Sequence, residues 1–354
     1  MPHLWIRAEQ RDNEDRTGLT PEGARALLAQ GFEITVERSS NRIIPDADYE
    51  QAGCAMVAGH SWPSAPHNAI ILGLKELPDD GSPLPHRHIM FGHAFKGQFA
   101  GQRLLRRFRD GGGILLDLEY LVDDTGRRLA AFGYWAGYAG AAVSLLAWSA
   151  QQKGSVCPAV SVWPTKTDLL TELRAQLDRT GKDLPRVIII GALGRVGTGA
   201  RDLCEAAGCT VTGWDLKETV HGGPFPEILT HDVFLNCILA GPDTPVFVPK
   251  SSLEMPRSLG VIGDIACDPD SAYNPIPLYH EATDWSHPAI RVHDTPALDV
   301  MAIDNLPSLL PLESSQDFAA QLLPVLKDLV HADDPVWRRA ENTFRQHIND
   351  LGGT

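Results

Sequence analysis

The stretch RVIIIGALGRVGTGARDLCEAAG, residues 186–208, decides the fold of this chain. Its uninterrupted apolar run, Val187–Ile190, predicts a strand that is buried on both faces of a parallel sheet. Glycines follow at positions 191, 194, 197 and 199, and we expect a helix from Arg201. Such glycines shape a tight turn and bring the backbone close to a pyrophosphate at a helix N-terminus, so the stretch indicates a dinucleotide-binding site.

The residues after the glycines strengthen this interpretation. A second strand, CTVTGWD, ends in Asp215, which lies 21 residues after Gly194 (215 minus 194). An acid at about this spacing, roughly 20 residues, accepts hydrogen bonds from the adenosine ribose and repels a 2′-phosphate, which favours NAD. Lys217 leaves NADP open as an alternative. The simplest alternative is that the glycines only shape a strand–helix turn.

Length and composition limit the classes of protein to consider. A chain of 354 residues suits two domains, so we expect a cleft. The net charge of −14 argues against nucleic acid as a partner. The six cysteines include no CxxC pair, so neither a zinc site nor a secreted disulfide scaffold is indicated. The first residues are charged where a signal peptide is apolar, and we expect a cytoplasmic protein.

The order of apolar runs predicts the fold class and the domains. Residues 1–128 alternate short apolar runs with helical stretches, and Thr20-Pro21-Glu22 is typical of a helix start. The chain turns helical again after Pro311, and we expect this tail to return to the first domain. We therefore predict an α/β fold with two Rossmann-like domains and parallel-rich sheets, separated by an active-site cleft. Residues 1–130 and 315–354 would form the substrate domain and residues 131–314 the NAD-binding domain.

One segment, residues 129–148, carries no charge over a length that suits a membrane span. Its glycines and alanines make it only modestly apolar, and the rest of the chain is polar. We therefore expect no membrane insertion but a buried helix, whose small residues let it pack closely between the two domains.

Candidate acid–base residues follow the apolar runs of the first domain. Lys75 comes after AIILGL, and burial would make it a usable base, whereas an ordinary lysine at a strand end extends to solvent. His93, after Met-Phe-Gly on an apolar strand, is a candidate acid or base, the alternative being a core histidine. Together with His86 and His88 it raises the question of zinc, but no carboxylate or cysteine motif completes the set, so we expect no metal.

Ten segments in sequence order resemble one family nearly end to end. They are IRAE, LGLKELP, HIMFGHAFKGQ, LLDLEYL, GRRLAAFGYWAGYAGAA, IIIGALGRVGTGA, GWDLKET, GGPFPEI, NPIPLY and AIDNLPSLLPLE. The chain resembles the lysine-forming, NAD-dependent saccharopine dehydrogenases, within the alanine dehydrogenase and transhydrogenase fold group. The resemblance implies oxidation of saccharopine by NAD⁺ and water to lysine, 2-oxoglutarate and NADH. We expect no partner beyond these small molecules and a monomer, with a weak dimer as the alternative.

The resemblance also implies roles for particular residues. Lys75 would be the base for the substrate amine, and His93 would act on the water. Substrate contacts would fall on Arg16, Gln98, Glu119, Arg128, Phe132 and Asp268, with Glu119 tuning the lysine. Cofactor contacts would fall on Arg127, Gly194, Arg195, Asp215, Thr219, Ile265, Ile303, Asp304, Asn305 and Leu306. Ala266 and Cys267 differ from the fungal pattern. An alanine-dehydrogenase-like or opine-type enzyme and a non-catalytic NAD-binding protein remain the alternatives.

Overall fold

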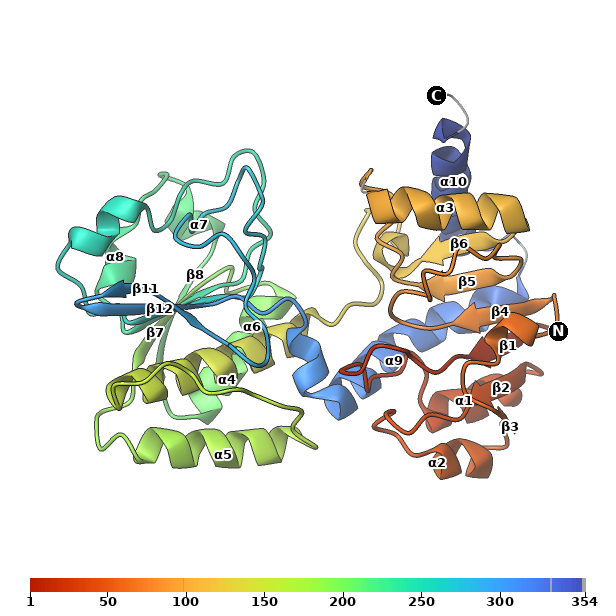
Figure 1. The fold of residues 1–354 in the computed structure, drawn as a ribbon, viewed down its shortest axis with the longest axis horizontal. Helices are drawn as coiled ribbons and strands as arrows, with labels where there is room; N and C mark the ends of the chain where they lie inside the picture. The colour runs from red at the N-terminus through yellow and green to blue at the C-terminus, as the bar shows by residue number, and fades with distance from the viewer. Residues whose placement is uncertain (98, 332, 352–354) are drawn as a thin grey trace. The chain divides into compact units, whose positions relative to one another are not determined.

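The chain forms two compact units, shown in Figure 1. The computed structural model describes residues 1–97, 99–331 and 333–351. Unit 1 comprises residues 1–131 and 311–354, and unit 2 comprises residues 132–310. We expected the boundaries after residues 130 and 314. The chain therefore leaves unit 1 once, builds unit 2 without interruption, and returns.

Unit 1 is built on a six-stranded sheet in which every neighbouring pair is parallel. The strands are β1 (His3–Ile6), β2 (Glu33–Glu37), β3 (Ala55–Val57), β4 (Ala69–Leu72), β5 (Arg87–Met90) and β6 (Ile114–Asp117). The α-helices are α1 (Pro21–Leu28), α2 (Asp46–Gln51), α3 (Phe99–Gly111), α9 (Pro311–Lys327) and α10 (Pro335–Asp350). The spatial order β3-β2-β1-β4-β5-β6 reverses between β1 and β4, and such a switch point is where open α/β sheets bind ligands.

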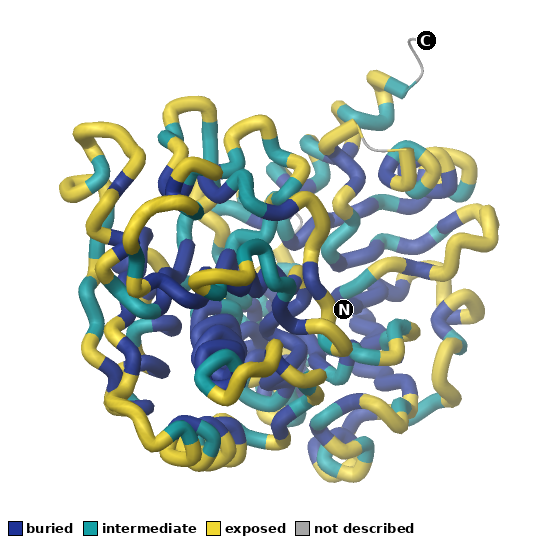
Figure 2. The backbone as a smooth tube through the Cα atoms, turned by 60° about the vertical axis from the view of Figure 1, so that its left-hand side comes forward, coloured by how far each residue is buried: buried dark blue, intermediate teal, exposed yellow. Residues whose placement is uncertain are grey.

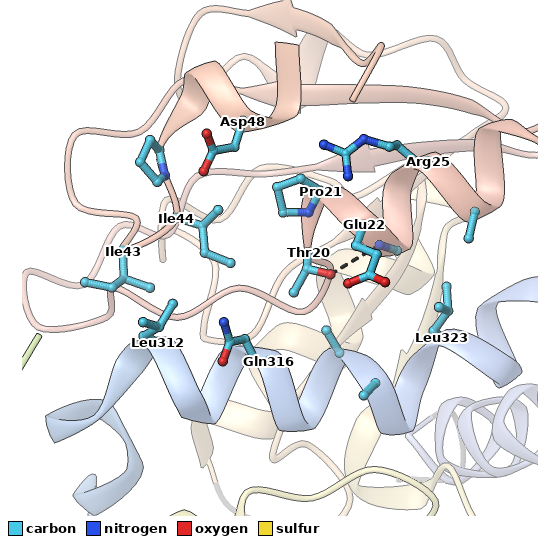
Figure 3. A pocket seen from close by; sticks show the side chains of 15 residues that line it. Thr20, Pro21, Glu22, Arg25, Ile43, Ile44, Asp48, Leu312, Gln316 and Leu323 are labelled. Carbon is cyan, nitrogen blue, oxygen red and sulfur yellow. Dashed lines mark hydrogen bonds between the residues drawn. The ribbon is translucent and has the colours of Figure 1, made fainter. Parts of the chain in front are cut away.

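Helix α1 begins as its sequence predicts. Thr20 is the N-cap, its hydroxyl accepts the N–H of Gly23 at 3.2 Å, and Pro21 is the first helical residue (Figure 3). Beside this helix a hollow of about 690 Å³ is lined by α1, the segment 43–48 and α9. The residues predicted for the active site do not line it.

Unit 2 holds a second six-stranded sheet, in the order β11-β12-β10-β9-β7-β8. Its strands are β7 (Arg186–Ile190), β8 (Thr210–Trp214), β9 (Val233–Asn236), β10 (Val261–Asp264), β11 (Ile290–Asp294) and β12 (Ala297–Met301). Its α-helices are α4 (Gly133–Gln152), α5 (Lys166–Asp178), α6 (Arg195–Ala206), α7 (Leu216–Thr219) and α8 (Pro226–Leu229). Only the β11–β12 pair among these strands is antiparallel. Two parallel-rich sheets confirm the predicted fold class.

The uncharged segment forms α4, in which residues 137–150 are all buried. This helix packs against α6 within unit 2, whereas we expected it to pack between the domains. A Cβ at Gly137 would lie 1.9 Å from the carbonyl oxygen of Val196. Glycine is therefore what allows the two backbones to approach so closely. Among the described residues, no helix has the length and apolarity that a membrane crossing requires.

Helix α6 begins at Arg195, so the expected start at Arg201 is wrong. Gly197 and Gly199 lie inside the helix rather than in the turn before it. A Cβ at Gly197 would lie 2.1 Å from the carbonyl oxygen of Gly191, and one at Gly199 would lie 1.9 Å from that of Tyr134. These glycines thus serve close packing of the helix against the β7 turn and α4. Figure 2 shows buried residues, in dark blue, gathered inside and exposed ones mainly in the loops.

Candidate active site

The glycine turn of unit 2 connects β7 directly to the N-terminus of α6. Gly191 has a φ of +87°, a conformation that favours glycine, and Gly194 is the N-cap of the helix. The N–H of Leu193, in the middle of the turn, donates to Asp215 Oδ2 at 3.0 Å. Asp215 also caps α7, since its Oδ1 accepts the N–H of Leu216 at 2.9 Å. The acid that the sequence assigned to the ribose therefore also holds the glycine turn.

A hollow of about 640 Å³ lies at the carboxyl ends of β7, β8 and β9. Gly191, Asp215 and Thr219 line it, and the sheet order reverses here, between β7 and β9. Two more of its lining residues, Leu216 and Leu239, are 82% and 85% exposed. Large apolar side chains gathered at the rim of a hollow indicate a surface that a ligand covers. The residues present fit the adenosine half of NAD.

The other predicted residues of unit 2 lie at the starts of α4 and α6, against the middle of α4, and in the segments after β10 and β12. Phe132 is the N-cap of α4, and Arg195 is the first residue of α6. Ile265 and Leu306 both contact α4 at Gly140, where a Cβ would lie 2.7 Å and 3.0 Å from their side chains. The remaining residues follow β10 or β12, namely Asp268, Ile303, Asp304 and Asn305. Burial first, then the charges of Asp304, Asp264 and Asp268, raise the pKa of the Cys267 thiol to about 12.

In unit 1, Lys75 follows β4 at the switch point of the sheet. The buried carboxylate of Glu14, which is paired with Arg16, interacts electrostatically with Lys75. Arg16 binds Glu14 through two contacts, Nε to Oε1 at 2.7 Å and Nη2 to Oε2 at 2.6 Å. Burial alone would raise the pKa of Glu14. The opposing effects of Arg16 and then of Lys75 are together larger, so the pKa of Glu14 lies below its ordinary value. Arg16, a predicted substrate contact, thus has a carboxylate partner within the protein.

The sequence predicts an apolar strand at His93, but in the structure this residue lies in a loop. Strand β5 ends at Met90, and His93 has a φ of +47°, which extended strands do not adopt. The physical reason lies in Gly92, whose N–H donates to the side chain of Asp117 at 3.2 Å. Because β4 and β5 are neighbours, Lys75 and His93 follow adjacent strands at one edge of the sheet.

A cluster of charged side chains surrounds Glu119. Its Oε1 accepts Lys96 Nζ at 3.0 Å and Arg128 Nη2 at 3.2 Å, and its Oε2 lies 3.5 Å from His93 Nδ1, an ion-pair distance. His93, then Lys96 and Arg128, lower the pKa of Glu119 to about 2 against the opposing effect of burial. Three predicted residues therefore meet here. Lys96 was missed by sequence reasoning, although its position three residues after His93 was a signal.

Arg127 and His88 have partners other than Glu119. Arg127 is 78% exposed and contacts Asp123 at 3.4 Å, and Gln98 lies outside the described residues. His88 is buried between the rings of Trp62 and Phe108, at 5.1 and 5.3 Å, and burial lowers its pKa well below the ordinary value. The described part of the chain contains no group of three or more His, Cys, Asp or Glu side chains arranged to hold a metal.

Asp117, at the end of β6, connects the His93 loop to Glu119. It is completely buried, and it accepts the N–H of Gly92 at 3.2 Å and that of Glu119 at 2.9 Å. Burial raises its pKa to about 6, although the hydrogen bonds from Glu119 and Gly92 and the charge of His93 act against this. Asp117 therefore changes charge near neutral pH.

We expect Asp117→Asn to change how the stability depends on pH. The folded-state pKa of about 6 lies above the unfolded value of 3.8, so the folded protein binds the proton more tightly. This stabilisation is fully present below about pH 4 and is lost as the pH rises through about 6. Relative to the variant, the parent should lose up to about 3 kcal/mol over this window. Urea unfolding across the window measures the difference, and a constant difference would contradict the prediction.

The chain is similar to known proteins both in sequence and in fold. The family model described as "Alanine dehydrogenase/PNT, N-terminal domain" matches residues 5–139. The chain is 44% identical to the saccharopine dehydrogenase [NAD(+), L-lysine-forming] of Schizosaccharomyces pombe, over 99% of both chains. It is 43% identical to the enzyme of the same name from Yarrowia lipolytica, over 99% of this chain and 98% of that one.

A solved L-alanine dehydrogenase structure has the same fold, with a TM-score of 0.72, 20% identity and 99% of both chains covered. At that identity the likeness concerns the fold alone. The specific relationship comes from the two fungal proteins, whose similarity extends through both units. The chain belongs to the family of NAD-dependent, L-lysine-forming saccharopine dehydrogenases.

Proposed function

We propose that this chain oxidises saccharopine with NAD⁺ and water to lysine, 2-oxoglutarate and NADH, reversibly, as an enzyme of lysine metabolism. The observation that carries the proposal is the identity of 42% to 44% with six enzymes of that name over nearly the whole chain. The hollow beside Asp215 supports the choice of cofactor. The acid–base groups at the sheet edge of unit 1 support the chemistry.

The proposed mechanism gives separate tasks to two residues. Lys75 Nζ accepts the proton of the secondary amine of saccharopine, so that the nitrogen lone pair becomes available to form the imine. The NAD⁺ that the residues around Asp215 would hold would supply the acceptor for the hydride of the glutamyl α-carbon. His93 then removes a proton from the water that attacks the imine carbon, and the resulting carbinolamine collapses to 2-oxoglutarate and lysine. Glu119, whose pKa of about 2 keeps it ionised, places Oε2 at 3.5 Å from His93 Nδ1, so a negative charge faces the ring that takes up the proton of the water.

The activity is tested by the absorbance of NADH formed from saccharopine and NAD⁺. We expect turnover with saccharopine, none with alanine, and none with NADP⁺ at the same concentration. Oxidation of alanine in place of saccharopine would favour the alanine-dehydrogenase-like alternative. NADH binding without turnover of either substrate would favour a non-catalytic NAD-binding protein.

Asp215→Asn should relax the choice between the two cofactors. The substitution removes the negative charge that repels a 2′-phosphate but keeps one oxygen to accept the N–H of Leu193. We expect the KM for NAD⁺ to rise about tenfold or more, from the loss of a charge-assisted hydrogen bond, and NADP⁺ to become a usable substrate. Steady-state kinetics with both cofactors measure the ratio. Asp183→Asn, an exposed acid in the segment before β7, is the control, and an unchanged ratio in Asp215→Asn would contradict the prediction.

A further inference from the structure

Two charged residues directly after β1, Arg7 and Glu9, form a buried ion pair. Arg7 Nη2 lies 3.1 Å from Glu9 Oε2, and the two side chains are only 2% and 7% exposed. They are adjacent to the end of β4, because β1 and β4 are paired at the switch point of the sheet. Neither residue belongs to the set that the sequence assigned to substrate, cofactor or acid–base chemistry.

This pair holds the main chain of Lys75 from both sides. The carboxylate of Glu9 accepts the N–H of Leu74 at 2.6 Å and that of Lys75 at 3.0 Å. Arg7 Nη2 donates to the carbonyl oxygen of Lys75. A Cβ at Gly73 would lie 2.1 Å from Arg7 Nε, so the glycine leaves the space that the guanidinium occupies. The N–H and C=O groups of Lys75 are therefore bound by side chains instead of by a neighbouring strand.

A buried ion pair is a costly way to stabilise a fold. Removing two charges from water costs about as much as their attraction returns, and apolar residues of similar volume often stabilise a core equally well. Burial also raises the pKa of Glu9, against the effects of Arg7 and of the N–H groups of Leu74 and Lys75. The stability of the fold therefore does not explain why a charged pair is buried here. The need to hold the Lys75 main chain in one exact position does explain it.

We propose that Arg7 and Glu9 are positioning residues, which fix the main chain of Lys75 so that its amine reaches the substrate nitrogen in the geometry that proton transfer needs. The inference rests on the proposed role of Lys75 as the base. A displacement of a reacting group by about 1 Å costs roughly 100-fold in rate. Side chains that fix the main chain of Lys75 therefore have a large effect on turnover.

The test compares Arg7→Lys and Glu9→Gln with Arg42→Lys in the full chain. Arg42 is a matched control, because it is also buried, binds Asp46 at 3.0 Å and donates to the carbonyl oxygen of Glu37 at 2.7 Å. We expect kcat for saccharopine to fall about 10- to 100-fold in the first two variants. The solvent deuterium isotope effect on kcat should rise, since proton transfer becomes slower than hydride transfer. The Kd of NADH should stay at the parent value.

Two outcomes would overturn the inference, and a third would overturn the role of Lys75 on which it rests. Parent kcat in Arg7→Lys and Glu9→Gln, at parent melting temperature, overturns the inference. A lower kcat without a larger solvent isotope effect also overturns it, because a smaller fraction of folded protein reduces kcat in that way. Lys75→Met, assayed in parallel, distinguishes this failure from that of the proposed function: if it retains parent turnover, the assignment of Lys75 itself is wrong.

Discussion

Replacing Lys75 with methionine is expected to lower kcat/KM for saccharopine about 100- to 10,000-fold, the range of a lost general base. Methionine is unbranched and similar in length, but it has no amine to accept the substrate proton. The effect should be confined to chemistry, because the hollow beside Asp215 is in the other unit and does not include Lys75. Steady-state rates together with the Kd of NADH, measured by its fluorescence, check both parts.

The matched control for this variant is Lys182→Met. Lys182 is exposed in the segment between α5 and β7 and lies outside both sites, so its replacement should leave kcat/KM unchanged. If Lys75→Met retains the parent kcat/KM while its melting temperature is also unchanged, Lys75 is not the base. A parallel loss of NADH binding would instead show that the substitution disturbs more than the chemistry.

Gly199→Val should prevent unit 2 from reaching its native stability. A Cβ at Gly199 would lie 1.9 Å from the backbone carbonyl of Tyr134, and backbone cannot move aside as a flexible side chain can. Replacing a helical glycine by alanine gains up to about 1 kcal/mol in helix propensity, whereas forcing extra atoms into a packed core costs about 1–3 kcal/mol or more. With the larger, branched valine the steric cost wins, and NADH binding should be lost with the fold.

Thr198→Val provides the comparison, since Thr198 is the exposed neighbour in the same helix. It loses the hydrogen bond from its hydroxyl to the carbonyl of Gly194 but meets no backbone. Urea unfolding and NADH titration of the two variants measure the difference. A Gly199→Val protein with parent stability would show that α4 and α6 separate at little cost.

The sequence was most informative where local chemistry alone determines the structure. The apolar run before Gly191 forms the buried strand β7, and the Thr20-Pro21 pair begins α1, because strand burial and helix capping depend on residues next to each other in the chain. The predicted start of α6 was wrong because it depends on residues that are distant in the chain. Glycines at 197 and 199 look like turn residues, and only the carbonyl groups opposite them show that they belong to a closely packed helix.

Only part of the candidate site could be predicted from the sequence. A residue that follows an apolar strand, such as Lys75, can be found from its position in the sequence. The loop conformation of His93 cannot, because it depends on a hydrogen bond from Gly92 to Asp117, 25 residues further along the chain. The same holds for the Arg7–Glu9 pair, whose contact with Lys75 exists only once β1 and β4 are paired.

The path of the chain through the two units has a consequence for how a ribosome produces this protein. Unit 2 is complete in sequence at residue 310, when unit 1 still lacks α9 and α10. The N-terminal sheet was synthesised long before, yet α9 packs on α1, and α10 on α3 and β6. At roughly 5–20 residues per second, synthesis of unit 2 takes on the order of ten to forty seconds. We expect the nascent residues 1–131 to expose, during that interval, the apolar surface that α9 and α10 later cover, and exposed apolar surface of this kind is what chaperones bind.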